Sequence, residues 1–372
     1  MKKMSVGGFF AGCGGLDFGF QNAGYELKWA NEIEANFASS YQSLTKHNCQ
    51  VGDFWEMAND VPNVDVVVGG PPCQSFSLVG KRLDDDPRGK LVGGFFQLIA
   101  SRRPKAFLME NVAGLAASNY EGRRLPEYLN EEFQKLGYST LVERVDASDF
   151  FVPQRRKRLI IMGVLAPKSE LKLVTQEKFA EHIKKRTGIL LPLRKVTALD
   201  ALADLPTPSL TKNSLTNYPD IARSAYGEIM RLGAGESISL QTMPTMSQLD
   251  KEFVKHIPQG GNYEDIPDSI STTRIMKFKA SGGRTTTYGR LDENQPAYTI
   301  NTYFNRPNVG ANYHYKEERL ITVREAMRLQ SFPDSFTPTF KSQRELHIQI
   351  GNAVPPLLAE ALALTLKESI LG

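Results

Sequence analysis

The sequence predicts an α/β protein, with a mostly parallel, doubly wound sheet and a smaller, irregular β-rich domain. Strand-like and helix-like segments alternate over the first 165 residues, as in βαβ units. From about Pro167, proline, threonine, serine and asparagine become more frequent and the apolar runs shorten. Regular periodicity returns near Leu320. We therefore expect the main domain to occupy residues 1–166 and 319–372, and a separate domain to occupy residues 167–318.

The elements can be placed in order by their apolar spacing. Strands are expected at residues 4–10, 26–30, 64–68, 106–109, 138–145 and 159–165. Helices are expected at residues 15–23, 35–44, 91–100, 124–136, 323–329 and 355–370, with short β-type runs at residues 285–303. The last two strands follow each other with no helical segment between them, which favours an antiparallel pair at one edge. Thr322 can cap the helix at 323–329, with Glu325 in its first turn.

The composition limits the classes of function. The net charge of +4 permits a polyanionic partner without requiring one. Three cysteines in 372 residues form no disulfide framework and indicate a reducing compartment, so we expect a cytoplasmic protein. No Cys or His cluster has metal-ligand spacing, and no segment approaches the roughly 18 apolar residues of a membrane helix. We therefore expect neither a metal site nor a membrane span.

A cysteine in the run GGPPCQSFS, residues 69–77, is the first candidate for catalysis. The run follows the buried strand expected at 64–68, so Cys73 lies just beyond a strand end, where open α/β sheets bind ligands. Two glycines let a ligand approach the backbone, and two prolines stiffen the path to the sulfur. The alternative is a buried, unreactive cysteine in a tight turn, which would be favoured for an isolated cysteine.

A glycine-rich turn, FFAGCGGLDFGF at residues 9–20, joins the first strand to the first helix. Such a turn lets a ligand lie against the backbone and the helix N-terminus. The spacing is not GxGxxG, so a dinucleotide is less favoured. Glu32, near the end of the next strand, is placed to bind ribose hydroxyls, and Asp53 could accept a hydrogen bond from an adenine amino group. The alternative is a purely structural turn.

Two further segments carry polar groups that could act on a substrate. Glu110 ends the apolar strand AFLM and could hand a proton to a ring nitrogen, or else be a capping or ion-paired glutamate. Arg156 and Arg158 alternate in an extended segment, so both fall on one side and could bind a base carbonyl, a carboxylate or a phosphate. The alternative for both arginines is a solvated edge strand protected by charge.

The polar segment at residues 76–90 is a candidate lid over an anionic substrate, with Gly80 and Gly89 as hinges. Its alternative is a surface loop without a role. Near the C-terminus, Asn352 follows a glycine and is expected to open a helix, where it could both cap the helix and contact a ligand.

Taken in order, these segments resemble the successive motifs of the DNA (cytosine-5)-methyltransferase family. The matching runs are FAGCGG, PPCQ, ENV, QRRKR, RLQSFPD and GNAVPP, within residues 1–165 and 320–372. The combination of PCQ, ENV and QRxR in this order is far more specific than any single run. The irregular middle lies where that family has its target-recognition domain. The resemblance therefore implies the fold of an S-adenosylmethionine-dependent methyltransferase.

The resemblance also implies methylation of C5 of cytosine in a specific double-stranded DNA sequence. Cys73 would add to C6 and so make C5 nucleophilic, Glu110 would hold or protonate N3, and Arg158 would hold the base carbonyl. Arg156 would assist around the pocket. Because a stacked base is out of reach, the cytosine would flip out of the helix.

Further contacts are implied in the same way. The S-adenosyl-L-methionine pocket would be formed by Phe10, Ala11, Gly12, Gly14, Gly15, Leu16, Glu32, Ile33, Asp53, Phe54, Pro72, Leu91, Asn352 and Ala353. DNA contacts would come from Gln74, Ser77, Lys81, Arg82, Arg284, Arg290 and Arg306. Ile33 stands where many members have an aromatic residue near the adenine. We expect a monomer that acts on double-stranded DNA, and the resemblance is compatible with a separately encoded cognate restriction endonuclease.

Three other functions fit part of this pattern. RNA (tRNA) cytosine-5 methylation would use the same chemistry, but a middle domain of this length suits duplex DNA. The presence of Cys73 and Glu110 argues against a catalytically silent DNA-binding relative. A nicotinamide oxidoreductase shares the fold class, but its GxGxxG turn is missing from the glycine-rich segment.

Overall fold

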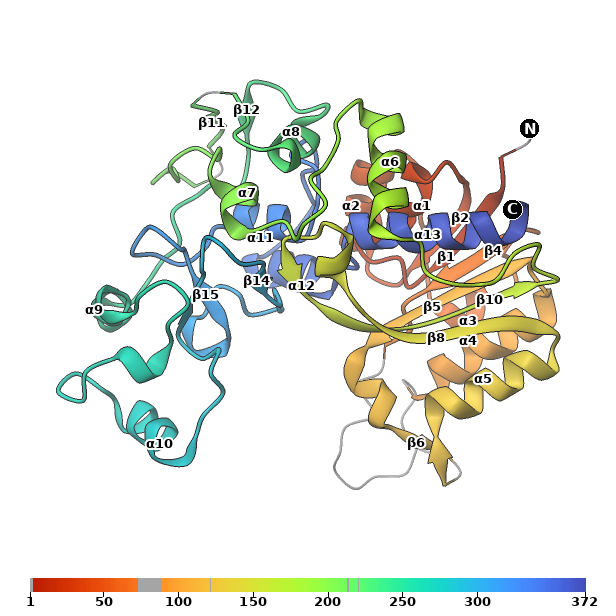
Figure 1. Ribbon diagram of the computed structural model, residues 1–372, viewed down its shortest axis with the longest axis horizontal. Helices are drawn as coiled ribbons and strands as arrows, with labels where there is room; N and C mark the ends of the chain where they lie inside the picture. Colours follow the sequence, from red (N-terminus) through yellow and green to blue (C-terminus); the bar gives the residue numbers. More distant parts are fainter. Residues whose placement is uncertain (1–2, 73–88, 121, 213, 220) are drawn as a thin grey trace. The chain divides into compact units, whose positions relative to one another are not determined.

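The computed structural model describes residues 3–72, 89–120, 122–212, 214–219 and 221–372, which form two compact units (Figure 1). The first unit comprises Met1–Asp146, Lys157–Phe179 and Val354–Gly372, and the second comprises Ala147–Arg156 and Ala180–Ala353. Several predicted site residues and most of the candidate lid at 76–90 lie outside the described residues. These predicted residues are Cys73, Gln74, Ser77, Lys81 and Arg82.

A seven-stranded sheet forms the centre of the first unit, in the order β3-β2-β1-β4-β5-β10-β8. The strands are β1 (Ser5–Phe9), β2 (Glu26–Glu32), β3 (Gln50–Val51), β4 (Val66–Gly69), β5 (Ala106–Val112), β8 (Tyr138–Asp146) and β10 (Lys157–Leu165). The pairs from β3 to β5 are parallel, whereas β10 is antiparallel to both β5 and β8. The predicted α/β class and the predicted antiparallel pair are therefore confirmed.

Helices cover both faces of this sheet, with α1, α2 and α13 over one face and α4 and α5 over the other (Figure 1). This explains why three consecutive residues of β4, Val66, Val67 and Val68, are all buried. At Gly19 in α1, an added Cβ would lie 2.4 Å from the Cβ of Ala359 in α13, so glycine permits the close packing of these helices. The helices are α1 (Gly15–Asn22), α2 (Ala35–Thr45), α3 (Phe54–Met57), α4 (Gly89–Arg102), α5 (Leu125–Lys135) and α13 (Pro356–Leu371), with minor elements η1 (Ala113–Ala117), β6 (Asn119–Tyr120) and β7 (Arg123–Arg124).

The second unit is irregular, as predicted, but the prediction that it is β-rich is wrong. Its described strands have only two or three residues: β9 (Gln154–Arg155), β11 (Thr216–Asn217), β12 (Ser237–Ile238), β13 (Gly289–Arg290), β14 (Ala297–Tyr298) and β15 (Ala311–Tyr313). The longer elements are helices: α7 (Ala198–Leu202), α8 (Ala225–Arg231), α9 (Gln248–His256), α10 (Thr273–Ser281), α11 (Val323–Leu329) and α12 (Gln343–Asn352). The remaining elements are η2 (Ala147–Phe150), η3 (Tyr263–Asp265), η4 (Pro307–Val309) and α6 (Gln176–Thr187), whose first residues belong to the first unit. Phe253, Val254 and Ile257 have helical spacing and pack in one apolar cluster with Ile275, so short helices rather than strands bury the apolar side chains here.

The chain returns to the first unit at Val354, whereas the sequence placed that return at residue 319. The reason lies in α11, where Arg328 is fully buried and forms ion pairs with Asp204 and Asp334. A buried guanidinium requires such partners, and both carboxylates belong to the second unit. No helix in the described parts of the chain is both long and apolar enough to span a membrane.

Candidate active site

The carboxyl ends of the parallel strands bring the predicted site residues of the first unit to one edge of the sheet. Phe10 follows β1, Glu32 is the last residue of β2, Gly70 follows β4, and Glu110 lies near the end of β5. Neighbouring parallel strands end at the same edge, so residues far apart in the sequence become neighbours. The order of strands thus assembles a site that the chain order only suggests.

The glycine-rich turn has the backbone conformation that its composition predicts. Gly12 and Gly14 have φ angles of 55° and 92°, in the left-handed region that favours glycine. The carboxylate of Glu32 accepts hydrogen bonds from the N–H of Gly12 (2.8 Å) and the N–H of Glu34 (3.0 Å). Burial raises the pKa of Glu32, although these N–H donors oppose the shift. Each carboxylate oxygen retains a further lone pair that can accept from a hydroxyl group.

Apolar surface adjoins this carboxylate. Ile33 is 60% exposed and Trp55 is 46% exposed, so both side chains are accessible to a ligand. Phe10 stacks on Phe54 with ring centroids 5.1 Å apart. Asp53 caps α3 by accepting a hydrogen bond from the N–H of Trp55 at 2.8 Å. Sequence reasoning missed Trp55, because nothing in the sequence shows that this aromatic ring stays exposed.

The other predicted pocket residues of this unit belong to the turn itself, to the apolar cluster or to the segment before Cys73. Gly15 begins α1, Ala11 and Leu16 are buried, and Leu91 packs against the apolar cluster beneath the sheet. Pro72, the last described residue before Cys73, is half-buried.

Asn111 fixes the path of the chain toward Cys73. Its side-chain amide donates a 2.9 Å hydrogen bond to the carbonyl of Pro71, and both groups are buried. At Gly70 an added Cβ would lie 3.3 Å from Oε2 of Glu110, so the same segment passes beside that carboxylate. Asn111 was absent from the predicted site residues, although it lies within the ENV motif. The sequence did contain a signal, since an amide next to a carboxylate that is predicted to be catalytic can hold an adjacent loop.

Glu110 and Arg158 form an ion pair on neighbouring antiparallel strands. Nε of Arg158 lies 2.8 Å from Oε1 of Glu110, and the two side chains are only 12% and 10% exposed. The strand register pairs Arg158 with Val112, two residues from Glu110, so both side chains share one face. The structure therefore brings together two residues that the sequence predicts to be catalytic. It confirms the ion-paired interpretation of Glu110, whereas the catalytic one stays a prediction.

Arg156 lies in the second unit and differs from Arg158 in its surroundings. It is fully buried, and its guanidinium donates to the carbonyls of Ile300 (3.0 Å), Gly351 (2.9 Å) and Ala353 (2.8 Å). The guanidinium therefore binds backbone carbonyls of its own unit, and because it is fully buried it is not accessible to a substrate. The sequence pattern placed both arginines on one side of a single strand, but β9 ends at Arg155 and β10 begins at Lys157.

Asn352 is the last residue of α12, so the prediction that it opens a helix is wrong. The next helix begins only at Pro356, since the two prolines that follow Val354 restrict the backbone between the helices. Asn352 is exposed in the second unit, beside the segment that Arg156 holds.

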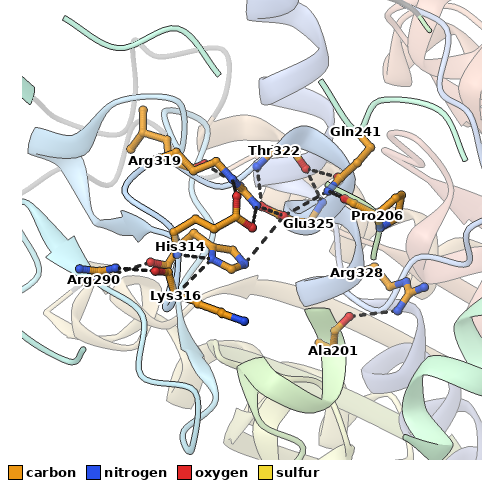
Figure 2. A network of polar contacts seen from close by, with 12 residues as sticks. Ala201, Pro206, Gln241, Arg290, His314, Lys316, Arg319, Thr322, Glu325 and Arg328 are labelled. Atoms are coloured by element: carbon orange, nitrogen blue, oxygen red, sulfur yellow. Dashed lines mark hydrogen bonds and ion pairs between the residues drawn. The ribbon is translucent and has the colours of Figure 1, made fainter. Parts of the chain in front are cut away.

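The predicted DNA contacts in the second unit separate into two kinds. Arg284 and Arg306 are exposed. Arg290 instead donates to the carbonyls of His314 and Lys316 (Figure 2). It also donates to the carbonyls of Val254 and Ile257, so all three of its nitrogens are occupied. The structure thus contradicts the predicted DNA contact of Arg290, because its guanidinium joins three segments of the fold.

The segment that precedes the RLQSFPD run, from Arg319 to Glu325, is also structural. Arg319 binds both carboxylate oxygens of Glu325 at 2.8 Å, and Thr322 caps the same helix (Figure 2). Burial alone would raise the pKa of Glu325, but the charge of Arg319 outweighs it and lowers the pKa to about 2. The predicted capping of this helix by Thr322 is confirmed, and the Glu325 side chain completes a capping box.

Comparisons with known proteins agree with this geometry. A family model of C-5 cytosine-specific DNA methylases matches residues 4–368. The type II methyltransferase M1.HphI of Haemophilus parahaemolyticus is 31% identical over 367 residues, covering 95% of this chain and 84% of that protein. The type II methyltransferase M.MthTI of Methanothermobacter thermautotrophicus is 30% identical over 382 residues, covering 100% of this chain and 99% of that protein.

Solved structures share the fold. A candidate DNA modification methyltransferase encoded within an E. coli prophage matches with a TM-score of 0.71 and 25% identity, over 99% of both chains. DNMT2 of Spodoptera frugiperda matches with a TM-score of 0.60 over 98% of this chain and 100% of that chain, and at 14% identity it supports the fold alone. The predicted family resemblance is confirmed by the family model, which spans nearly the whole sequence. The chain belongs to the C-5 cytosine-specific DNA methylases and is a DNA cytosine-5 methyltransferase.

Proposed function

We propose that this chain methylates cytosine within one specific double-stranded DNA sequence, with the cytosine flipped out of the helix and bonded transiently to Cys73. The observation that carries the proposal is the Glu110–Arg158 ion pair beside the Gly70–Pro71 segment, which leads directly to Cys73. The ion pair thus provides a carboxyl group and a guanidinium where the described chain leads to Cys73, and a thiol there would complete the groups that activation of a pyrimidine requires.

The chemistry follows from the weak nucleophilicity of C5 in cytosine. Addition of the Cys73 thiolate to C6 forms a C–S bond and moves ring electrons toward N3, which makes C5 the nucleophilic carbon of an enamine. After C5 is methylated, a base removes its proton, the C5–C6 double bond re-forms, and the thiolate leaves. Because C6 is inaccessible in a stacked duplex, the base must leave the helix first.

Glu110 and Arg158 are suited to neighbouring atoms of one pyrimidine. N3 and the C2 carbonyl oxygen are adjacent on the ring, as the two side chains are adjacent on the sheet. Glu110 would hold or protonate N3, which makes C6 more electrophilic. Arg158 would donate to the carbonyl oxygen and keep the carboxyl group in place.

The first unit also provides a fitting site for S-adenosyl-L-methionine. When bound, this group supplies an electrophilic sulfonium methyl. Glu32 would accept from the ribose hydroxyls, Asp53 from the adenine amino group, and Ile33 with Trp55 would cover the adenine. At Gly12, where an added Cβ would meet nothing within 4 Å, the positive-φ turn leaves room for the methionine part against the backbone. Phe10 and the other predicted pocket residues would complete the site.

In the second unit, Arg156 would act as a positioning residue. It fixes Gly351 and Ala353 on either side of Asn352, the residue proposed to contact the cofactor. The same unit would read the DNA sequence through exposed side chains such as Arg284 and Arg306.

The biological role we propose is that of a modification enzyme. Relatives named type II methyltransferases support a role in restriction–modification with a separately encoded cognate endonuclease. We further propose that the chain acts as a monomer, since methylation of one base requires one active site.

The test is transfer of labelled methyl groups from S-adenosylmethionine to duplex DNA. Cys73→Ser should abolish transfer, whereas Cys49→Ser, at a free cysteine of the first unit, should retain it. A duplex with 5-fluorocytosine at the target should trap an adduct, since fluorine at C5 cannot leave as a proton. Mass spectrometry should place the adduct on residue 73, and bisulfite sequencing of plasmid DNA from expressing cells would identify the target sequence. Equal transfer by Cys73→Ser, or an adduct on another residue, would refute the mechanism.

A further inference from the structure

We propose that Tyr303, Arg306 and Arg344 form a clamp that binds the sugar–phosphate backbone of the DNA substrate. This inference rests on the proposed function and adds to it a contact that carries affinity without reading bases. All three residues lie in the second unit and belong to two segments separated by about forty residues. Arg344 was not among the predicted site residues, and Arg306 was expected only as a general DNA contact.

The three side chains form a compact cluster around one aromatic ring. The guanidinium carbon of Arg344 lies 3.9 Å from the ring centroid of Tyr303, and that of Arg306 lies 5.0 Å from the same centroid. Arg344 also donates to the Tyr303 hydroxyl at 2.6 Å. The two guanidinium groups cannot be farther apart than the sum of these distances, which is shorter than the Debye length of roughly 10 Å at 0.1 M salt. Their charges therefore act together.

The positive charge of this cluster is not neutralised within the described residues. Among those residues neither Arg306 nor Arg344 forms an ion pair, and both side chains are exposed. The hydrogen-bond partners of Arg344 are uncharged, namely the carbonyl of Thr302 and the hydroxyl of Tyr303. The charge of Arg344 also acts on His347 of the same helix. Burial, together with this charge, lowers the pKa of His347 to about 4. Two uncompensated guanidinium groups so close to each other favour an anion that can accept from both, as a phosphodiester does.

The backbone beneath the cluster is held firmly. The N–H of Tyr303 donates to the side chain of Asn301 at 2.7 Å, and the N–H of Arg306 donates to the carbonyl of Tyr303 at 2.9 Å. Next to Tyr303, the ring of Phe304 is buried against His347 of α12 with centroids 4.6 Å apart. The guanidinium groups are therefore presented from an ordered base, which reduces the entropy lost on binding.

The clamp is continuous with the segment that Arg156 holds. Helix α12 carries Arg344 in its first turn and ends at Asn352. At Gly351 an added Cβ would lie 2.4 Å from the N of Thr302, so the Tyr303 loop and the end of α12 pack directly together. A phosphate bound by Arg344 would therefore be fixed on the same rigid piece as Asn352, which gives the clamp a role in placing DNA.

Binding of duplex DNA as a function of salt concentration tests this proposal. In Arg344→Gln and in Arg306→Gln, the slope of log K against log salt should each decrease in magnitude by about 0.9, the value for one lost phosphate contact. Affinity should fall about tenfold, and equally for duplexes with and without the target sequence. Arg344→Lys should restore the slope, since the charge returns. Arg123→Gln is the matched control, because Arg123 also lies over a tyrosine ring but is already paired with Glu131 at 2.6 Å.

Other outcomes would overturn the proposal. An unchanged slope in Arg344→Gln, with an unchanged melting temperature, would show that the residue does not contact phosphate. A loss of affinity confined to the target sequence would make the cluster a base reader instead. Methyl transfer by the parent protein is measured on the same DNA. If the parent transfers methyl groups but the salt dependence of the variants is unchanged, only the clamp is refuted; if the parent transfers none, the proposed function is refuted.

Discussion

The side-chain amide of Asn111 donates a 2.9 Å hydrogen bond to the carbonyl of Pro71 and so anchors the chain to β5 two residues before Cys73. Since Glu110 precedes Asn111, one strand end both carries the carboxyl group that is predicted to be catalytic and holds the backbone of Pro71, which leads to Cys73. We expect this coupling to keep the Cys73 segment and Glu110 in a constant relationship.

Asn111→Ala should lower the rate of methyl transfer while leaving S-adenosylmethionine affinity nearly unchanged. The variant leaves the buried carbonyl of Pro71 without its donor, which costs about 1–3 kcal/mol of folding free energy. Single-turnover kinetics and urea unfolding measure the two effects. Gln134→Ala, at an exposed amide of α5, is the control. Normal single-turnover rates in Asn111→Ala would contradict the anchoring role.

Glu110→Gln should reduce the single-turnover rate about 10²–10⁴-fold, because the amide cannot transfer a proton to N3. Arg158→Ala should lower the rate of methyl transfer and also lower the free energy of unfolding by about 2–3 kcal/mol. The substitution removes the cation that is paired with the nearly buried carboxylate of Glu110. A double-mutant cycle in unfolding free energy should show coupling of more than about 1 kcal/mol. Additive effects would mean that the ion pair contributes nothing.

The stability of the second unit should depend on the charge of Glu325 at acid pH. Its folded pKa, about 2, lies below the ordinary value of 4.5, so its contribution is complete above about pH 4.5 and is lost as the pH falls toward 2. The shift corresponds to a contribution on the order of 3 kcal/mol. Glu325→Gln should therefore be much less stable than the parent near pH 7, and the difference in unfolding free energy should shrink near pH 2.5. For Glu318→Gln, at an exposed carboxylate, the difference in unfolding free energy from the parent should not change with pH. A difference for Glu325→Gln that stays the same from pH 7 to pH 2.5 would disprove the role of the Glu325 charge.

Arg290→Met should lower the melting temperature without altering which DNA sequence is methylated. The substitution removes hydrogen bonds to four carbonyls, and those left buried lose their donors. Arg284→Ala, at an exposed arginine, should have the opposite profile, with weaker DNA binding and an unchanged melting temperature. Calorimetry and bisulfite sequencing distinguish them. A changed target sequence in Arg290→Met at full stability would restore its role as a DNA contact.

Gly19→Ala should destabilise the first unit by about 1–3 kcal/mol. The added methyl group would lie 2.4 Å from the Cβ of Ala359 and 2.6 Å from the backbone of Glu360, so α13 must move. Gly93→Ala is the matched helical control, because an added Cβ there meets nothing within 4 Å and should stabilise α4 by about 0.5–1 kcal/mol. Equal stability of the two variants in urea unfolding would show that α1 and α13 do not require this close contact.

The sequence by itself determined the features that depend on local spacing. The alternation of strands and helices, the helix that Thr322 caps and the positive-φ turn at Gly12 and Gly14 all follow from neighbouring residues. The candidate catalytic residues Glu110 and Arg158 were also identified, because each adjoins an apolar strand whose end is readable in the sequence. A capping or ion-paired Glu110 was the alternative to a catalytic one, and only the tertiary structure showed that its ion-pair partner is Arg158.

Only the tertiary structure decided the roles of the arginines. In sequence Arg156, Arg290 and Arg306 are alike, but the first two are enclosed by backbone carbonyls and the third remains exposed. The tertiary structure also places residues 319–353 in the second unit and brings Arg344 into contact with Tyr303. The physical reason is that a guanidinium is directed by the partners within its reach. Those partners come from segments distant in the sequence, so local spacing carries no information about them.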